Sequence, residues 1–237
     1  MNNPVPASLT IPAVVESIDD VHHDIRIIRI RPTAGSVTWA AGQYMELTFA
    51  GFPPRPYSIG SAPHSGLPEF HIRRAGINGV SQHVANTVKT GDVVDLRGPF
   101  GNAGIIPGDT MPLLLVAGGM GLPPMKAMID DAMYRGDTRP VTLYWGTRTP
   151  EEMYLMDYFT KLAAGNAHFK FVPVVGGEVS KEIGNEGDLS GVRVYLAGPP
   201  PMIHASVTAV LKSGADLNLI HSDDVPTLNQ FRNPAGP

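Results

Sequence analysis

The sequence contains no cysteine among its 237 residues. Without cysteine, the chain cannot carry disulfides, thiolate-bound zinc, cysteine-ligated iron–sulfur clusters or a thiol nucleophile. Charged residues are also scarce, at 17%, and the net charge is −4. A weakly acidic chain has no general attraction for nucleic acid or for an anionic membrane surface. We therefore expect no nucleic-acid partner.

Long apolar runs and an early positive charge are missing as well. The most apolar stretch, residues 111–125, is interrupted by glycines and prolines, and it is too short to span a bilayer. The first Lys or Arg is Arg26, so a cationic segment does not precede an apolar one, as a signal peptide requires. From these features we expect no membrane span and a cytoplasmic location.

Glycine and proline are abundant, with 26 and 23 residues, which is typical of many turns and short strands. In the first 100 residues, short β-branched or alternating segments recur between turn signals, at residues 25–30, 44–49, 70–73 and 93–96. This spacing predicts a small antiparallel β-barrel. One helix is predicted over residues 81–89, with Ser81 as its N-cap.

The second half of the chain has a different pattern of apolar residues. Residues 113–117, 141–145 and 192–197 are continuous apolar runs, typical of strands buried on both faces. Each is followed by a turn and a helical stretch, and residues 149–152 read as a capping box. Repeated strand, turn and helix predict a doubly wound parallel α/β domain. Because glycine and proline cluster at residues 104–108, we predict two domains, residues 1–105 and 106–237.

Two motifs in the first half have the chemistry of a phosphate-bearing aromatic ligand. Segment 55–58 reads Arg-Pro-Tyr-Ser, and residues two apart on an extended chain face the same side, so Arg55 and Tyr57 can share one ligand. Segment 78–81 reads Asn-Gly-Val-Ser and opens the predicted helix, whose N-terminal amides can bind a pyrophosphate. Each motif alone also fits an ordinary turn or N-cap.

The order of motifs resembles that of the ferredoxin–NADP reductase superfamily, which are flavin-dependent NAD(P)H oxidoreductases. Segment 55–58 is similar to the family's flavin motif, and segment 78–81 to its pyrophosphate loop. Segments 115–125, 146–148 and 197–202 resemble its nucleotide turn, its adenosine-reading segment and its C-G-P-x-x-M motif. The resemblance covers nearly the whole chain. It implies an FAD-binding barrel over 1–105 and an NAD(P)-binding domain with a C-terminal tail over 106–237.

The resemblance also implies a role for individual residues. Arg55 would bind the flavin phosphate, Tyr57 would stack on the isoalloxazine, and Ser58 would donate a hydrogen bond near flavin N5, so Tyr57 and Ser58 are the expected catalytic residues. The backbone and side chains of residues 71–73 would line the flavin. The other expected cofactor-binding residues are Pro56, His71, Ile72, Arg73, Gly79, Val80, Ser81, Gly118, Gly119, Gly121, Gly146, Thr147, Arg148, Ala197, Gly198, Pro199, Met202 and Asp223.

The sequence departs from the family pattern at two positions. Ala197 stands where the family usually has a cysteine beside the nicotinamide. We expect this departure to affect the rate of hydride transfer and not the binding of the dinucleotide. Val225 stands where the family often has an aromatic residue after the final Ser-Asp. We expect the tail, whose one aromatic residue is Phe231, to fold back over the flavin in its place.

The function that the resemblance implies is transfer of hydride from NAD(P)H to FAD and of electrons to a separate acceptor. That acceptor is a ferredoxin or flavodoxin, a free flavin, a ferric complex or an oxygenase component. FAD is favoured over FMN, and NADH over NADPH because Arg148 is the one cation in its segment. Two alternatives stay open: an electron-transfer subunit of a larger complex, and a non-catalytic flavin- or nucleotide-binding regulator.

Other candidate sites are rejected on the sequence. His22, His23 and Asp24 are consecutive, and because neighbours on a strand point to opposite faces, we expect a surface turn and no metal site. Ser58 and Ser81 lack the G-x-S-x-G context of a serine hydrolase.

Overall fold

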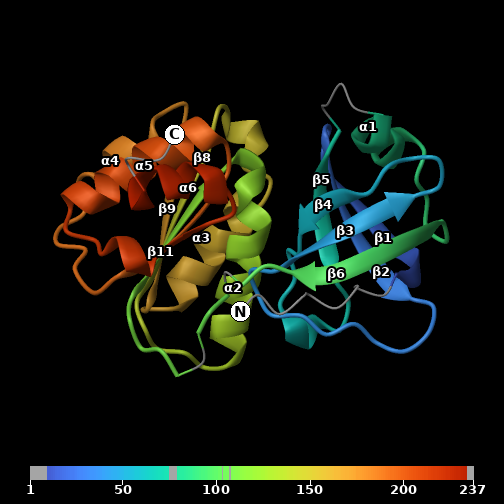
Figure 1. Cartoon of the computed structure of the whole chain (residues 1–237), viewed down its shortest axis with the longest axis horizontal. Helices are drawn as coiled ribbons and strands as arrows, with labels where there is room; N and C mark the ends of the chain where they lie inside the picture. The colour runs from blue at the N-terminus through green and yellow to red at the C-terminus, as the bar shows by residue number, and fades with distance from the viewer. Residues whose placement is uncertain (1–9, 75–78, 103, 107, 234–237) are drawn as a thin grey trace. The chain divides into compact units, whose positions relative to one another are not determined.

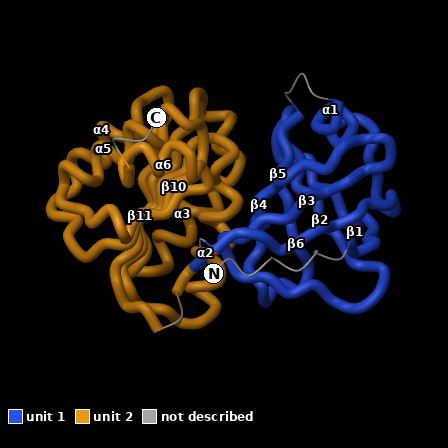
Figure 2. Tube along the Cα trace, viewed as in Figure 1, with its two compact units in different colours: residues 1–104 blue, residues 105–237 orange. Residues whose placement is uncertain are grey.

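The computed structural model describes residues 10–74, 79–102, 104–106 and 108–233. The chain divides into two compact units, residues 1–104 (unit 1) and 105–237 (unit 2), which Figure 2 shows in blue and orange. The predicted domain boundary, after residue 105, lies one residue further along the chain. Among the described helices, none has both the length and the apolar character needed to cross a membrane.

Unit 1 is a six-stranded antiparallel sheet in the order β4-β3-β6-β1-β2-β5. The two edge strands, β4 and β5, approach each other at one end. There the N–H of Gly60, two residues after β4, donates a hydrogen bond to the carbonyl of Glu69 in β5 at 2.7 Å. The predicted antiparallel, barrel-like fold is thereby confirmed. The strands are β1 (Ile11–His22), β2 (Ile25–Pro32), β3 (Tyr44–Phe49), β4 (Arg55–Ser58), β5 (Glu69–Arg73) and β6 (Val93–Phe100).

Alternation along the strands places the core of unit 1. In β3, Met45, Leu47 and Phe49 are buried while the residues between them are not, as expected of a strand with one face in the core. Helix α1 (Gly79–Asn86) covers this core with Val80 and Val84. The helix begins at Gly79, so the prediction of Ser81 as its N-cap is wrong, and Ser81 lies in the first turn.

Unit 2 is a five-stranded parallel sheet in the order β11-β10-β7-β8-β9. The first strand of the unit, β7, lies in the middle, with β8 on one side and β10 on the other, so the direction of winding reverses between β7 and β10. This confirms the predicted doubly wound α/β domain. The strands are β7 (Leu113–Gly118), β8 (Val141–Thr147), β9 (Phe169–Val175), β10 (Arg193–Ala197) and β11 (Ile220–Ser222).

Helices cover both faces of this parallel sheet (Figure 1). On one face, Val116 of β7 belongs to the same core cluster as Val207. On the other face, the Trp145 ring of β8 meets the Phe159 ring, with ring centroids 6.3 Å apart. Both faces are therefore buried, which explains the continuous apolar runs in the sequence. The helices are α2 (Leu122–Tyr134), α3 (Met156–Gly165), α4 (Val179–Ile183), α5 (Pro200–Lys212) and α6 (Val225–Arg232).

Candidate functional site

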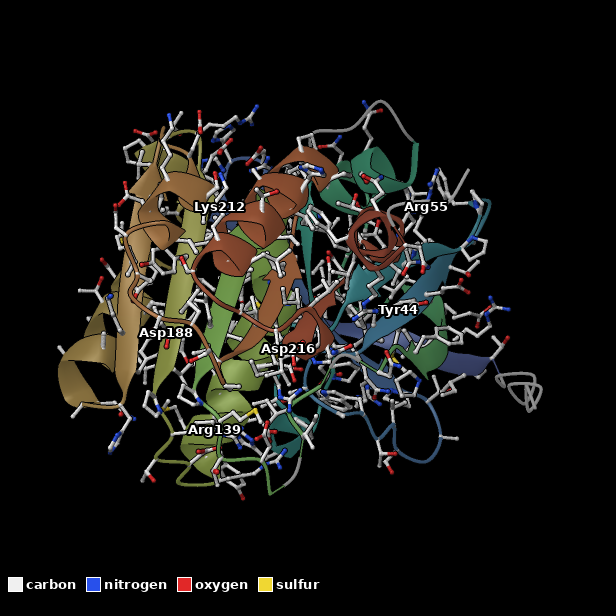
Figure 3. All side chains as sticks on the ribbon, turned by 60° about the vertical axis from the view of Figure 1, so that its left-hand side comes forward. Tyr44, Arg55, Arg139, Asp188, Lys212 and Asp216 are labelled. Atoms are coloured by element: carbon white, nitrogen blue, oxygen red, sulfur yellow. The ribbon has the colours of Figure 1, made fainter. Side chains whose placement is uncertain are left out.

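Residues from two of the predicted flavin motifs meet in unit 1. Tyr57 on edge strand β4 forms a side-chain hydrogen bond with Ser81 in the first turn of α1, and Arg55 lies near enough to act on Tyr57 electrostatically. Burial raises the pKa of Tyr57, while the Ser81 hydrogen bond and the Arg55 charge act in the opposite direction. Arg55 itself is exposed at the surface (Figure 3). The structure thus brings together a cation, an aromatic ring and a helix N-terminus from segments far apart in sequence.

The neighbouring predicted residues have different exposures. Pro56 is exposed and Ser58 is half-buried, with Ser58 paired to Tyr44 of β3. Figure 3 labels Tyr44 on the strand beside Arg55. Ser58 therefore lies at the half-buried end of β4, whereas Arg55 and Pro56 form its exposed end.

The start of α1 is held close to the loop between β3 and β4. A Cβ on Gly79 would lie 3.2 Å from Cε1 of Phe52, and the Phe52 ring stacks on His83 with centroids 4.5 Å apart. Val80 has its side chain in the core, so only its backbone can bind a ligand. Asn78, part of the predicted pyrophosphate loop, lies outside the described residues.

Strand β5 requires a correction. The side chain of His71 is buried and bonded to Glu69 at 2.9 Å, and Glu69 also pairs with Arg29 at 2.7 Å. The side chain of Ile72 lies in the hydrophobic core. The expectation that these two side chains line the flavin is therefore wrong, and only their backbone is available. Arg73 is half-buried and pairs with Asp24 at 3.5 Å.

The carboxyl ends of β7 and β10 approach each other as bare backbone. A Cβ on Gly121 would lie 2.0 Å from the Ala197 carbonyl oxygen, and one on Gly118 would lie 2.5 Å from Sδ of Met202. Gly198 has φ +143° and would place its Cβ 3.0 Å from the Gly118 backbone. A side chain at Gly121 would collide with backbone, one at Gly198 would be strained, and one at Gly118 would require Met202 to move. Ligands of open α/β sheets bind at this reversal of strand order, where glycines allow close backbone approach.

Helix α2 begins directly at this reversal. Gly119, with φ +50°, opens a 3-10 turn over Gly119–Gly121, and α2 follows from Leu122 without an acidic residue in its first turn. The Trp145 indole N–H donates to the Gly119 carbonyl at 3.1 Å and fixes the turn. This role of Trp145 cannot be read from the sequence, because an apolar run shows only that the residue is buried. Pro123 and Pro124 carry no N–H group, so α2 offers a dinucleotide pyrophosphate the positive end of its dipole rather than a full set of amides.

The segment after β8 is held by Glu152, the last residue of the predicted capping box. Glu152 accepts hydrogen bonds from both the backbone N–H and the Nε of Arg148, each at 3.0 Å. The side chain of Thr149 makes no capping bond, the turn at Pro150–Glu152 is 3-10, and α3 begins only at Met156. The predicted helix start at Pro150 is therefore wrong, although Glu152 does reach back to an earlier amide.

Two further predicted residues of this segment have structural partners. A Cβ on Gly146 would lie 2.3 Å from Cγ2 of Val179, so α4 packs against bare backbone there. The Thr147 hydroxyl donates to the Thr149 carbonyl at 2.9 Å, which shapes the turn that presents Arg148.

Asp223, after the last strand, joins the reversal of strand order. Its carboxylate accepts hydrogen bonds from the backbone N–H groups of Gly198 and Asp224. Although the residue is exposed at the surface, the protein atoms packed around its carboxyl group raise its pKa to about 6. Pro199 is exposed and precedes the first residue of α5. The structure therefore gathers Gly118, Gly121, Ala197, Gly198, Met202 and Asp223 at one edge of the sheet.

The tail does not match the expectation of a segment free to cover a flavin. It forms helix α6, capped by Asp224, and Leu228 is 2% exposed in the core of unit 2. Phe231 packs against the same core and meets His204 of α5, with ring centroids 4.9 Å apart. Val225, at the position where the family often has an aromatic residue, is the exposed first residue of this helix.

Comparisons with known proteins match both units. The family model of the oxidoreductase FAD-binding domain matches residues 12–105, and that of the oxidoreductase NAD-binding domain matches residues 115–208. The ferredoxin–NAD(P)+ reductase component of the naphthalene 1,2-dioxygenase system of Pseudomonas putida is 31% identical over 224 residues, covering 90% of this chain and 68% of that protein.

Two further proteins show the same likeness. The CDP-6-deoxy-L-threo-D-glycero-4-hexulose-3-dehydrase reductase of Yersinia pseudotuberculosis is 32% identical over 228 residues, covering 90% of this chain and 68% of that protein. The crystal structure of the Amycolatopsis cytochrome P450 reductase GcoB matches with a TM-score of 0.82 at 27% identity, covering 91% of this chain and 69% of that one. The chain thus spans about two thirds of the length of these relatives.

Proposed function

The chain belongs to the FAD- and NAD-binding oxidoreductases of the ferredoxin–NAD(P)+ reductase family, and on that basis we propose that it is the reductase component of a multi-protein system with an iron–sulfur protein as its electron acceptor. Members of this family pass electrons from NAD(P)H through FAD to a separate acceptor, and the chain is an oxidoreductase of this kind. The observation that carries the proposal is the match of the chain to a reductase component that is named for its ferredoxin. None of the 237 residues is a cysteine that could ligate a cluster.

In this proposal, unit 1 holds the flavin with residues that fit its parts. The Arg55 guanidinium provides a charge-assisted partner for a phosphate, and the Tyr57 ring, fixed by Ser81, offers a flat surface for the ring system. Ser58, half-buried beside Tyr57, would hydrogen-bond close to the reacting atom. FAD held by Arg55, Tyr57 and Ser58 would supply the coupling between two-electron hydride transfer and one-electron acceptors. The protein's contribution is to position and orient these groups and to exclude water.

Unit 2 would bind the dinucleotide at the reversal of strand order. Gly118, Gly121 and Gly198 let the backbone approach the ligand closely, and the positive dipole end of α2 would face the pyrophosphate. Asp223, bonded to the Gly198 amide, would lie beside the nicotinamide. Ala197 in place of a cysteine leaves this pocket without a thiol, so no side chain there acts as a nucleophile.

We further propose that NADH is the preferred reductant. The guanidinium of Arg148, the cation that could bind a 2′-phosphate, is already bonded to Glu152. A 2′-phosphate would therefore meet a neutralised pair, whereas the 2′-hydroxyl of NADH carries no charge. The cytoplasm, where these dinucleotides are reduced in metabolism, remains the location we propose.

An anaerobic titration tests the function. The purified protein is expected to be yellow, and NADH should bleach the flavin absorbance with one equivalent per flavin, more readily than NADPH. Adding an oxidised [2Fe–2S] ferredoxin should restore the colour, with two ferredoxins reduced per NADH. A yellow protein that NADH does not bleach would instead be the non-catalytic regulator. Bleaching that only free flavin or ferric complexes reverse would exclude the iron–sulfur acceptor.

A further inference from the structure

The turn between β1 and β2 brings three metal-binding side chains together. Strand β1 ends at His22 and β2 begins at Ile25, so His23 and Asp24 form the turn. The pairing register shifts between Asp20 and His22, which breaks the alternation that would have sent neighbouring side chains to opposite faces. The rings of His22 and His23 consequently lie with centroids 3.9 Å apart. The expected surface turn is present at His23 and Asp24, but the premise that neighbouring side chains point to opposite faces does not hold there.

One ligand atom from each of His22, His23 and Asp24 lies within 4.8 Å of the other two. Among the residues that the structure describes, this is the one group of three His, Asp or Glu residues with ligand atoms so close. Nδ1 of His22 contacts the Asp24 carboxylate, an arrangement in which a carboxylate orients an imidazole for a metal.

The other ring nitrogen of His22 has no protein partner. The side chain is 11% exposed, and its Nε2 atom is buried without a hydrogen bond. Buried polar atoms nearly always have a partner, so an unpaired one requires an explanation such as a bound ion or water. His23 is exposed beside it, with a ring nitrogen within 4.8 Å of a ring nitrogen of His22.

We propose that this turn binds a divalent first-row transition ion through the imidazoles of His22 and His23, with the Asp24 carboxylate orienting the His22 ring. Imidazole donors suit ions such as Zn²⁺, Ni²⁺ and Cu²⁺, whereas Mg²⁺ and Ca²⁺ prefer sites built from oxygen alone. Metal–ligand bonds of about 2.0–2.2 Å place two donors on one ion at most about 4.4 Å apart. A small rotation of the exposed His23 closes the present spacing, and water completes the coordination.

The turn is anchored well enough to keep these donors in place. The Arg74 backbone N–H donates to the Asp24 carbonyl at 2.5 Å, and Arg73 pairs with the Asp24 carboxylate at 3.5 Å. Both contacts tie the turn to the end of β5. The site lies within unit 1 and does not depend on the proposed electron transfer.

Zn²⁺, which is redox-inert, is the probe for calorimetric titration of the flavin-loaded full chain, purified without a histidine tag at pH 7.5. We expect one saturable site per chain and no binding of Mg²⁺. Both His22→Ala and His23→Ala should weaken the affinity at least tenfold. The control His168→Ala, which removes an exposed imidazole of unit 2, should leave it unchanged.

His23 is exposed, so its replacement preserves the fold even if that of His22 does not. Circular dichroism and flavin content verify this. Cu²⁺ bound at the same stoichiometry should show hyperfine coupling to two nitrogens by electron paramagnetic resonance, and to one nitrogen in His23→Ala. The proposal is overturned if Zn²⁺ shows no saturable site, if His23→Ala binds as tightly as the original protein, or if His168→Ala weakens binding equally.

Discussion

Glu152 holds Arg148 at two points, by its backbone amide and by its guanidinium, with both hydrogen bonds at 3.0 Å. The glutamate side chain is 10% exposed, whereas that of the arginine is 78% exposed. The acid is therefore the fixed partner and the cation the mobile one. In doubly wound sheets the residues after the second strand meet the ribose 2′ position. We therefore propose that this pair decides between the two nicotinamide dinucleotides.

Replacing Glu152 with Gln should release Arg148 for a 2′-phosphate. We expect the ratio of kcat/KM for NADPH to that for NADH to rise about tenfold, equivalent to about 1.4 kcal/mol. Steady-state kinetics with both dinucleotides measure the ratio. Arg148→Ala is the control, and it should lower only the activity with NADPH. If the ratio does not change in Glu152→Gln, the pair has no part in specificity.

Arg55→Ala should weaken flavin binding, because it removes a charge-assisted partner of the phosphates. We expect a loss of about 1.5–3 kcal/mol, as for hydrogen bonds to charged groups. Flavin content after gel filtration and fluorescence titration of the apoprotein measure it. Arg97→Ala, which removes another exposed arginine of unit 1 paired with Glu46, is the matched control. Full retention of flavin by Arg55→Ala would show that our assignment of Arg55 is incorrect.

Gly121→Ala should disrupt the dinucleotide site, because the added methyl carbon would collide with the Ala197 carbonyl at 2.0 Å. The backbone of β7 and β10 must then separate, and we expect destabilisation of about 3 kcal/mol with loss of NADH binding. Thermal unfolding and NADH titration provide the measurements. Gly165→Ala, at a position with open space around the new carbon, should leave both unchanged. Equal effects of the two substitutions would count against the close approach as the cause.

The ionisation of Asp223 should appear in the pH dependence of turnover with NADH. Its pKa is raised to about 6, so the carboxylate becomes protonated as the pH falls through that value. A negative charge near the nicotinamide favours the positive ring that forms on hydride loss, so kcat/KM should decrease below pH 6. Asp223→Asn should flatten this part of the profile, and Asp157→Asn should not. A profile unchanged by Asp223→Asn would separate this carboxylate from the reaction.

The same raised pKa also affects the stability of the fold, and there the expected pH trend is opposite to that of kcat/KM. Because the folded protein binds the proton more tightly than the unfolded chain, this carboxylate lowers stability above pH 6, and that loss disappears as the pH falls toward about 4.

Truncation after Asp224 should destabilise unit 2 rather than expose the flavin. It removes α6, whose Leu228 is buried in the core and whose Arg232 donates to the Ile220 carbonyl at 3.0 Å. Leu228→Ala alone should cost about 2–5 kcal/mol, measured by chemical denaturation. The visible spectrum of flavin that remains bound should be unchanged in Leu228→Ala. A changed spectrum with unaltered stability would restore the view of the tail as a flavin cover.

The sequence predicted both folds because their periodicities are distinct. Alternation in the first half and buried runs such as residues 113–117 in the second reflect one and two covered faces, respectively. Predictions failed where a local signal competes with tertiary contacts. Ser81 has the composition of an N-cap, yet its hydroxyl bonds to Tyr57. His71 looked like a ligand-lining residue because the sequence does not reveal its pairing with Glu69.

The candidate site was predictable to the extent that it is made of glycine. Gly118, Gly121 and Gly198 mark close backbone approach, and glycine spacing is visible in one sequence. The partners of charged side chains are not visible in the same way. Glu152 could have been paired with Arg148 from their separation of four residues, which is typical of salt bridges, but the capping-box pattern suggested a different partner.

The strand order of the two sheets also determines when each can be completed during synthesis. Every strand of unit 1 precedes residue 101, so its sheet can close before β7 has been translated. In unit 2, the dinucleotide crevice requires β7 and β10 side by side. Residues 119–192 must be synthesised between these two strands, and the edge strand β11 follows later still. Domains fold in order as they emerge. A nascent chain stalled before residue 193 would therefore have a finished flavin unit and no dinucleotide crevice, and its ability to bind flavin could be assayed on the ribosome.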